Sequence, residues 1–72
     1  MNVFYMLTST TVTVEEETIN SYGISCVDRN VEQQSIQDIS CDKEYVEGII
    51  KTFNELQLAK EHFEDAVDDI LY

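Results

Sequence analysis

The sequence predicts an α+β domain in which a small antiparallel β-meander of two or three strands precedes a C-terminal αα-hairpin packed on one of its faces. Two observations support this prediction. The β-branched and aromatic residues are concentrated near the start of the chain, and two amphipathic helical patterns fill its last third. Strands followed by helices are typical of α+β folds with separate layers. We expect one domain over residues 1–72.

The strands are predicted from residue type and from turn signals. Residues 3–14 are rich in Thr, Val and aromatic side chains, which favour a strand. The adjacent carboxylates of residues 15–17 repel one another and prefer water, so they predict a hairpin tip. A second strand is expected over residues 18–27, where Gly23 indicates a bulge or a close contact.

A third strand is predicted less clearly over residues 31–39, after a turn at residues 28–30. Ile36 and Ile39 are its candidate anchors, and its glutamines place it at a sheet edge. The alternative is a loop across residues 31–35.

The first helix is expected over residues 42–54, where apolar side chains recur at the helical period. Ser40 or Asp42 is suited to cap its first turn, and Asn54 to end it in a left-handed conformation. Gly48 lies within the pattern and costs about 1 kcal/mol against alanine. Two interpretations of Gly48 stay open: simple tolerance, or close approach of another backbone.

The second helix is expected over residues 59–71. Its apolar face lies opposite an acidic stripe, which consists of Glu61, Glu64, Asp65, Asp68 and Asp69. Asp68 and Asp69 oppose the helix dipole, which favours cations at this end. Acidic residues at a helix end that favours cations indicate a role other than stability. The alternative is that the acidic stripe is an ordinary solvated face of the helix.

Charge is the strongest global signal. Fifteen acidic residues against four basic ones give a formal net charge of −11. Such a charge repels nucleic acid and anionic membranes and attracts basic partners. It is explained either by solubility alone or by docking on a basic protein surface, such as one that normally holds nucleic acid. A chain this short has a modest core, for which dimerisation is one ordinary remedy.

The two cysteines, Cys26 and Cys41, predict free, half-buried core thiols rather than a disulfide framework. Met1, Asn2 and Val3 lack the basic start of a signal peptide, and no stretch is long enough for a membrane span. A cytoplasmic location, where thiols stay reduced, is therefore expected.

Catalytic and metal-binding motifs are missing from the sequence. His62, the only histidine, lies three residues before Asp65, which is far short of the ligand set of a metal site. Cys26, Cys41 and His62 carry no signature of a catalytic cysteine, and two glycines are too few for a phosphate-binding loop. We therefore expect a protein that is not an enzyme and that needs no cofactor or metal.

Several short motifs occur in a familiar order. They are Tyr22-Gly23-Ile24, the run from Ile36 to Asp42, Phe53-Asn54-Glu55 with Leu56 and Leu58, and the run from His62 to Leu71. Over residues 18–71 this order resembles an uncharacterised family of short proteins from Gram-positive gut bacteria and their mobile elements, known as a domain of unknown function. The resemblance implies a compact domain of strands and then helices, and it implies no activity.

We therefore predict an acidic protein-interaction module that docks on a basic, nucleic-acid-binding protein surface. By size and charge alone it is similar to small acidic phage inhibitors of the anti-CRISPR or DNA-mimic type. The predicted contacts are Glu61, Glu64, Asp65, Asp68 and Asp69, with Glu15, Glu16 and Glu17 as a second cluster. The alternative is a structural or oligomerising protein that uses apolar surface at Tyr45, Phe53, Leu56, Leu58 and Tyr72.

Overall fold

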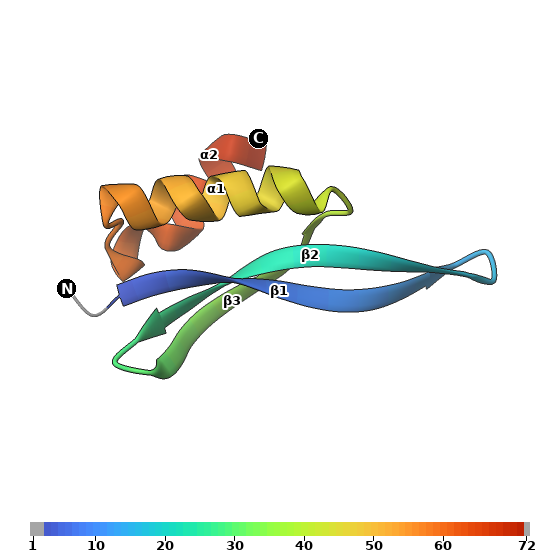
Figure 1. The fold of residues 1–72 in the computed structure, drawn as a ribbon, viewed down its shortest axis with the longest axis horizontal. Coiled ribbons are helices and arrows are strands. Elements are labelled where there is room, and N and C mark those ends of the chain that lie inside the picture. The colour runs from blue at the N-terminus through green and yellow to red at the C-terminus, as the bar shows by residue number, and fades with distance from the viewer. Residues whose placement is uncertain (1–2, 72) are drawn as a thin grey trace.

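The computed structural model describes residues 3–71 and confirms the predicted α+β fold, with a meander followed by helices. The elements are β1 (Val3–Val14), β2 (Glu17–Asp28), β3 (Val31–Ser40), α1 (Lys43–Leu56), the short 3₁₀ helix η1 (Lys60–His62) and α2 (Phe63–Leu71). The strands form an antiparallel sheet in the order β1-β2-β3. Figure 1 shows α1 and α2 on one face of this sheet.

The β1–β2 ribbon extends well past the helices, which gives the molecule a longest dimension of 43 Å (Figure 1). A two-residue turn closes its tip, with Glu15 and Glu16 at φ values of 50° and 67°. Arg29 and Asn30 form the equivalent turn between β2 and β3, with φ values of 55° and 65°. Two left-handed residues in succession are typical of the turns whose twist matches that of antiparallel strands. Both turns lie where the sequence predicts them.

The third strand is present along its whole predicted length, so the alternative of a loop over residues 31–35 is wrong. Its pairing with β2 is irregular at two places, and Asp38 adopts a left-handed φ of 58° beside one of them. At the same place β3 passes very close to Gly23. A Cβ atom on Gly23 would clash with the carbonyl oxygen of Ile36, so only glycine fits there. The predicted close contact at Gly23 is confirmed.

The core lies between the sheet and the helix layer. Its centre is aromatic: the Tyr5 ring is 5.4 Å from that of Phe53 and 5.3 Å from that of Phe63. Separations of this size suit edge-on and tilted aromatic packing. The sheet and both helices supply the buried cluster, which comprises Tyr5, Ile24, Cys26, Val46, Phe53, Phe63 and Val67.

The first helix begins as predicted and ends later than predicted. The Asp42 side chain caps it by accepting a hydrogen bond of 3.2 Å from the Tyr45 N–H. The predicted end at Asn54 is wrong: the helix continues to Leu56, and Gln57 takes the left-handed conformation, with φ of 52°. Asn54 stays within the helix, and its side chain forms hydrogen bonds with the backbone of Tyr5 on β1. Gly48 faces open space, which supports simple tolerance.

The second helix is shorter than the predicted span of 59–71. Ala59 is extended, η1 follows as a 3₁₀ turn, and α2 begins only at Phe63. The His62 N–H donates to the Ala59 carbonyl at 2.9 Å, which is the tighter hydrogen bond of a 3₁₀ turn. Ala59 carries no side-chain oxygen to cap a regular α-helix. The other predicted boundaries lie within one residue of the observed ones.

Candidate functional site

The first candidate site is the acidic surface, which we define as Glu61 on η1 together with Glu64, Asp65, Asp68 and Asp69 on α2. All five side chains are exposed. Phe63 and Val67 hold α2 on the core, with only 0% and 2% of their surfaces exposed. Because these two side chains fix the rotation of the helix, the carboxylates are presented to solvent on a defined face.

Few cations neutralise the carboxylates. Among residues 3–71 the ion pairs join Lys51 to Glu55 at 4.0 Å and Lys60 to Asp28 at 2.9 Å, and neither carboxylate belongs to the acidic surface. Within the described part of the chain, its hydrogen bond to the sheet is from the Gln34 amide to Glu64, at 3.4 Å. The hydrogen bond and the charge of the Asp28 carboxylate raise the pKa of Lys60. The ion pair with Asp28 holds this lysine against β2. The carboxylates of the acidic surface therefore form no ion pair within the described residues, and the charge of Glu61 acts on the neighbouring Lys60.

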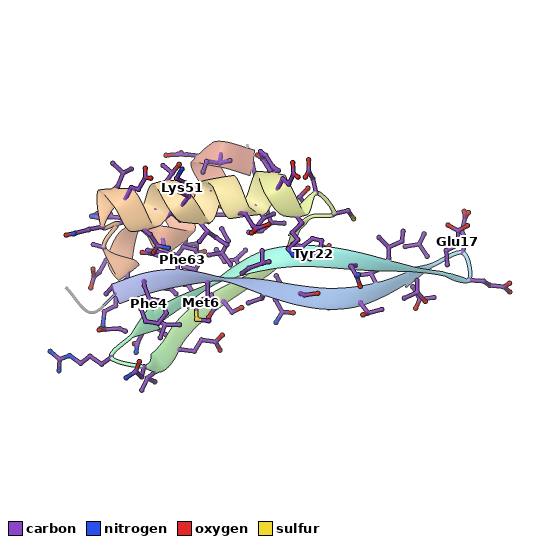
Figure 2. All side chains as sticks on the ribbon, viewed as in Figure 1. Phe4, Met6, Glu17, Tyr22, Lys51 and Phe63 are labelled. Carbon is purple, nitrogen blue, oxygen red and sulfur yellow. The ribbon has the colours of Figure 1, made fainter. Side chains whose placement is uncertain are left out.

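The second predicted cluster lies elsewhere. Glu15 and Glu16 form the turn at the tip of the β1–β2 ribbon, and Glu17 begins β2. In Figure 2 Glu17 lies at the far end of the ribbon, beyond the end of both helices. The structure thus does not bring the two predicted clusters together.

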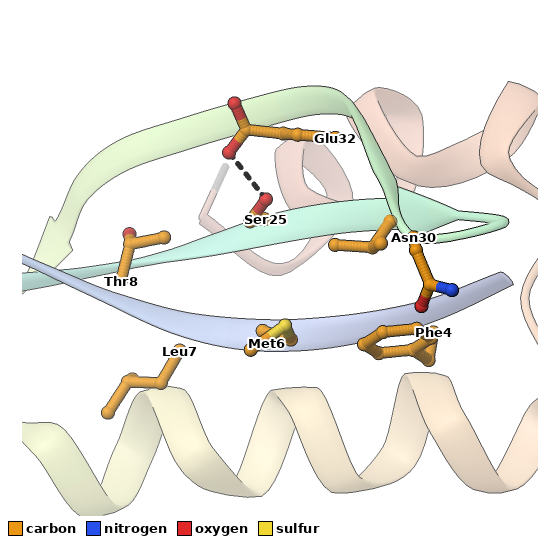
Figure 3. Close-up of a pocket in the computed structure, with 8 residues that line it drawn as sticks. Phe4, Met6, Leu7, Thr8, Ser25, Asn30 and Glu32 are labelled. Atoms are coloured by element: carbon orange, nitrogen blue, oxygen red, sulfur yellow. Dashed lines mark hydrogen bonds between the residues drawn. The ribbon is translucent and has the colours of Figure 1, made fainter.

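The sheet face opposite the helices contains a hollow of about 440 Å³ (Figure 3). Its apolar residues include Phe4 and Met6, which are 39% and 49% exposed and point away from α1 in Figure 2. On its polar side the Ser25 hydroxyl donates to Glu32 Oε1 at 2.6 Å. The complete lining is Phe4, Met6, Leu7, Thr8, Ser25, Val27, Asn30 and Glu32.

For binding a ligand, the hollow offers apolar side chains and one carboxylate, that of Glu32. The Glu32 carboxylate is the base within hydrogen-bond reach of the Ser25 hydroxyl, and His62, the only histidine of the chain, lies on η1 in the helix layer, on the other side of the sheet. Over residues 3–71 no three His, Cys, Asp or Glu side chains converge as ligands for a metal ion. In the same part of the chain, no helix has the length and hydropathy needed to cross a membrane.

The two cysteines differ in environment, and both are free. Cys26 is buried, as predicted for a core thiol, whereas the prediction is wrong for Cys41, which is exposed just after β3. Burial raises the pKa of the Cys26 thiol and that of the Tyr5 hydroxyl. Neither group is therefore activated at neutral pH.

The residues predicted for an apolar interface are only partly available. Phe53 is 4% exposed in the core, so its prediction as an interface residue is wrong. Leu58 is half-buried, and its carbonyl accepts a hydrogen bond of 2.7 Å from the Tyr5 hydroxyl. Tyr45 and Leu56 are 44% and 70% exposed. Tyr72 lies outside the described residues.

An additional feature, not predicted from the sequence, is the outer edge of β1. The Asn54 side chain accepts a hydrogen bond of 2.8 Å from the Tyr5 N–H and donates one of 3.1 Å to the Tyr5 carbonyl. Asn54 thus pairs with an edge strand as a neighbouring strand would. The signal for this edge was present in the sequence, because residues 3–14 contain no charged side chain.

Fold and surface together define a small acidic α+β domain, a three-stranded meander with one face covered by helices. The chain belongs to the family of unknown function DUF6514, whose model matches residues 1–72. This match confirms the expectation of a family without an assigned activity. No curated protein and no solved structure matches the chain.

Proposed function

We propose that this protein is a non-enzymatic interaction module whose acidic surface binds a basic protein surface. The observation that carries the proposal is that all five carboxylates of this surface are exposed and none has an ion-pair partner among residues 3–71. A basic partner would supply the missing cations. Electrostatic complementarity of this kind raises the association rate and selects the partner.

The position of the charges supports the same proposal. Asp68 and Asp69 lie near the C-terminus of α2, whose last turn contains no basic residue. Carboxylates at this end are unfavourable by about 0.3–1 kcal/mol each, because the helix dipole is negative there. A cationic partner would remove this unfavourable term, so binding and charge placement are consistent with each other.

A finer form of the proposal concerns the partner. One turn of an α-helix rises about 5.4 Å, which is comparable to the spacing of phosphates along a nucleic acid strand. Asp65 and Asp68, spaced about one turn apart, therefore suit a groove that normally binds nucleic acid. In its sharpest form the protein is an inhibitor of the DNA-mimic or anti-CRISPR type.

The test compares two variants with the same change in charge. Asp65→Lys/Asp68→Lys alters the acidic surface, and Glu15→Lys/Glu16→Lys alters the ribbon tip. Each variant and the wild type serve as bait for affinity capture at one fixed salt concentration. We expect the first variant to lose the basic partner and the second to retain it. Retention by both variants would remove the acidic surface from the proposal, and equal loss by both would show that only total charge matters.

A further inference from the structure

We propose that the outer edge of β1 is a self-association surface, on which β1 of a second copy of this chain pairs antiparallel to form a continuous six-stranded sheet. β1 lies at one edge of the sheet, so one side of its backbone faces away from β2. Tyr5 identifies that side, because its N–H and carbonyl point outward to Asn54.

Backbone direction alternates along a strand. The residues that point outward with Tyr5 are therefore Leu7, Ser9, Thr11 and Thr13, which we call the open edge. Among residues 3–71 no hydrogen bond engages the outward N–H or carbonyl groups of the open edge. These four alternate residues of β1 thus offer unpaired backbone N–H donors and carbonyl acceptors.

The open edge lacks the features that protect other strand edges. β3, at the opposite side of the sheet, is interrupted by two register shifts and carries Glu32 and Asp38. β1 is regular over twelve residues, and none of them is charged. A long, regular, uncharged edge strand is a template for pairing with another chain.

A second copy fits this template in one register. Antiparallel pairing centred on Thr10 places Leu7 opposite Thr13 of the second copy and Ser9 opposite its Thr11. Every residue of the open edge then exchanges hydrogen bonds. A register shifted in one direction would include Tyr5, whose backbone N–H and carbonyl already form hydrogen bonds with Asn54. A register shifted in the other direction would leave Leu7 unpaired. The edge is therefore complementary to itself.

The same register brings exposed apolar side chains together. Met6 and Val14 are each 49% exposed. Met6 points away from α1 in Figure 2, and Val14, an even number of residues further along β1, lies on the same face of the strand. Pairing centred on Thr10 places Met6 of one copy directly opposite Val14 of the other, twice in the symmetric assembly. Cross-strand apolar pairs of this kind stabilise a sheet, and both side chains lose water contact.

Charge also favours this surface for association between identical copies. Each chain carries a net charge of −11, so two copies repel one another over most of their surface. The open edge is an uncharged strip through which they can approach. It is also separate from the acidic surface, because Glu64 on α2 contacts Gln34 on β3, at the other edge of the sheet. Self-association through the open edge is therefore independent of binding by the acidic surface.

The test measures the mass of the full chain by sedimentation over a range of concentrations. We expect the mass to rise toward twice the 8.3 kDa of one chain, and the association to strengthen with added salt, which screens repulsion between the copies. A mass that stays at one chain at every concentration and salt would overturn the proposal.

Two proline variants form a matched pair, because Thr11 and Asn20 are directly opposite each other in the β1–β2 register. The N–H of each points away from the other strand, so proline removes no bond of the ribbon at either site. Thr11→Pro deletes two hydrogen bonds of the symmetric dimer, and we expect the association to weaken about tenfold or more. Asn20→Pro should leave it unchanged. Equal behaviour of the two variants would overturn the proposal.

Hydrogen exchange on the wild type tests the pairing of the open edge without a substitution. It replaces the comparison of proline variants if the Thr11→Pro chain does not fold. The amides of Leu7, Ser9, Thr11 and Thr13 should gain protection as concentration rises, while the amide of Asn20 should not. Protection that is independent of concentration would contradict the pairing.

Discussion

Asn54 allows the link between helix α1 and the edge of β1 to be tested quantitatively. The substitution Asn54→Ala removes both hydrogen bonds to the Tyr5 backbone, of 2.8 and 3.1 Å. Each contributes about 0.5–1.5 kcal/mol net. Alanine is the better helix former by roughly 0.6 kcal/mol, which offsets part of this loss. We therefore expect the free energy of unfolding to fall by about 1–2 kcal/mol.

The assay is urea unfolding followed by circular dichroism at a low, fixed protein concentration, because self-association would otherwise add to the apparent stability. Glu55→Ala is the matched control. Glu55 is the next residue of α1, and among residues 3–71 it forms one exposed ion pair, with Lys51, worth about 0.5 kcal/mol or less. If Asn54→Ala costs no more than Glu55→Ala, the Asn54 side chain does not hold the edge of β1 and the reasoning fails.

Two further predictions concern the sheet and the core. Gly23→Ala should lower the free energy of unfolding by about 3 kcal/mol, because the added methyl group meets the backbone of Ile36; a midpoint in urea equal to that of the wild type would contradict the close approach. Burial raises the pKa of Tyr5 in the folded protein, so the folded state favours the neutral hydroxyl. This contribution to the free energy of unfolding is complete below the ordinary pKa of about 10. Above that pH it decreases, by about 1.4 kcal/mol per pH unit at most. Between pH 9 and 11 the stability advantage of the wild type over Tyr5→Phe should shrink, and an advantage that stays constant would show that Tyr5 titrates normally.

The order of elements followed from the sequence because local signals agreed with the final packing. The helix around Val46 and Phe53 showed a clear apolar period, and both side chains are buried. Glu15 and Glu16 marked a turn because adjacent carboxylates avoid burial, and they form the turn of the β1–β2 ribbon. In these segments tertiary contacts reinforced what residue type already favoured.

The remaining features depend on contacts between distant residues, which local patterns do not encode. Asn54 had the residue type of a helix end, but its amide bonds to Tyr5, 49 positions away, and keeps it helical. Phe53 was assigned to an interface although it packs on Tyr5 and Phe63. The sequence indicated the acidic stripe of α2, but only the fold shows that it is separate from the ribbon tip.

The salt dependence of partner capture tests the central claim, that the acidic surface recruits a basic partner, most directly. The wild-type chain serves as bait in a native bacterial lysate at physiological and at high salt, and bound proteins are identified by mass spectrometry. Exposed charge contacts are screened by salt. We therefore predict a basic, nucleic-acid-binding protein that is captured at physiological salt and released at high salt. A partner that resists high salt, or the absence of any basic partner at physiological salt, would contradict the claim.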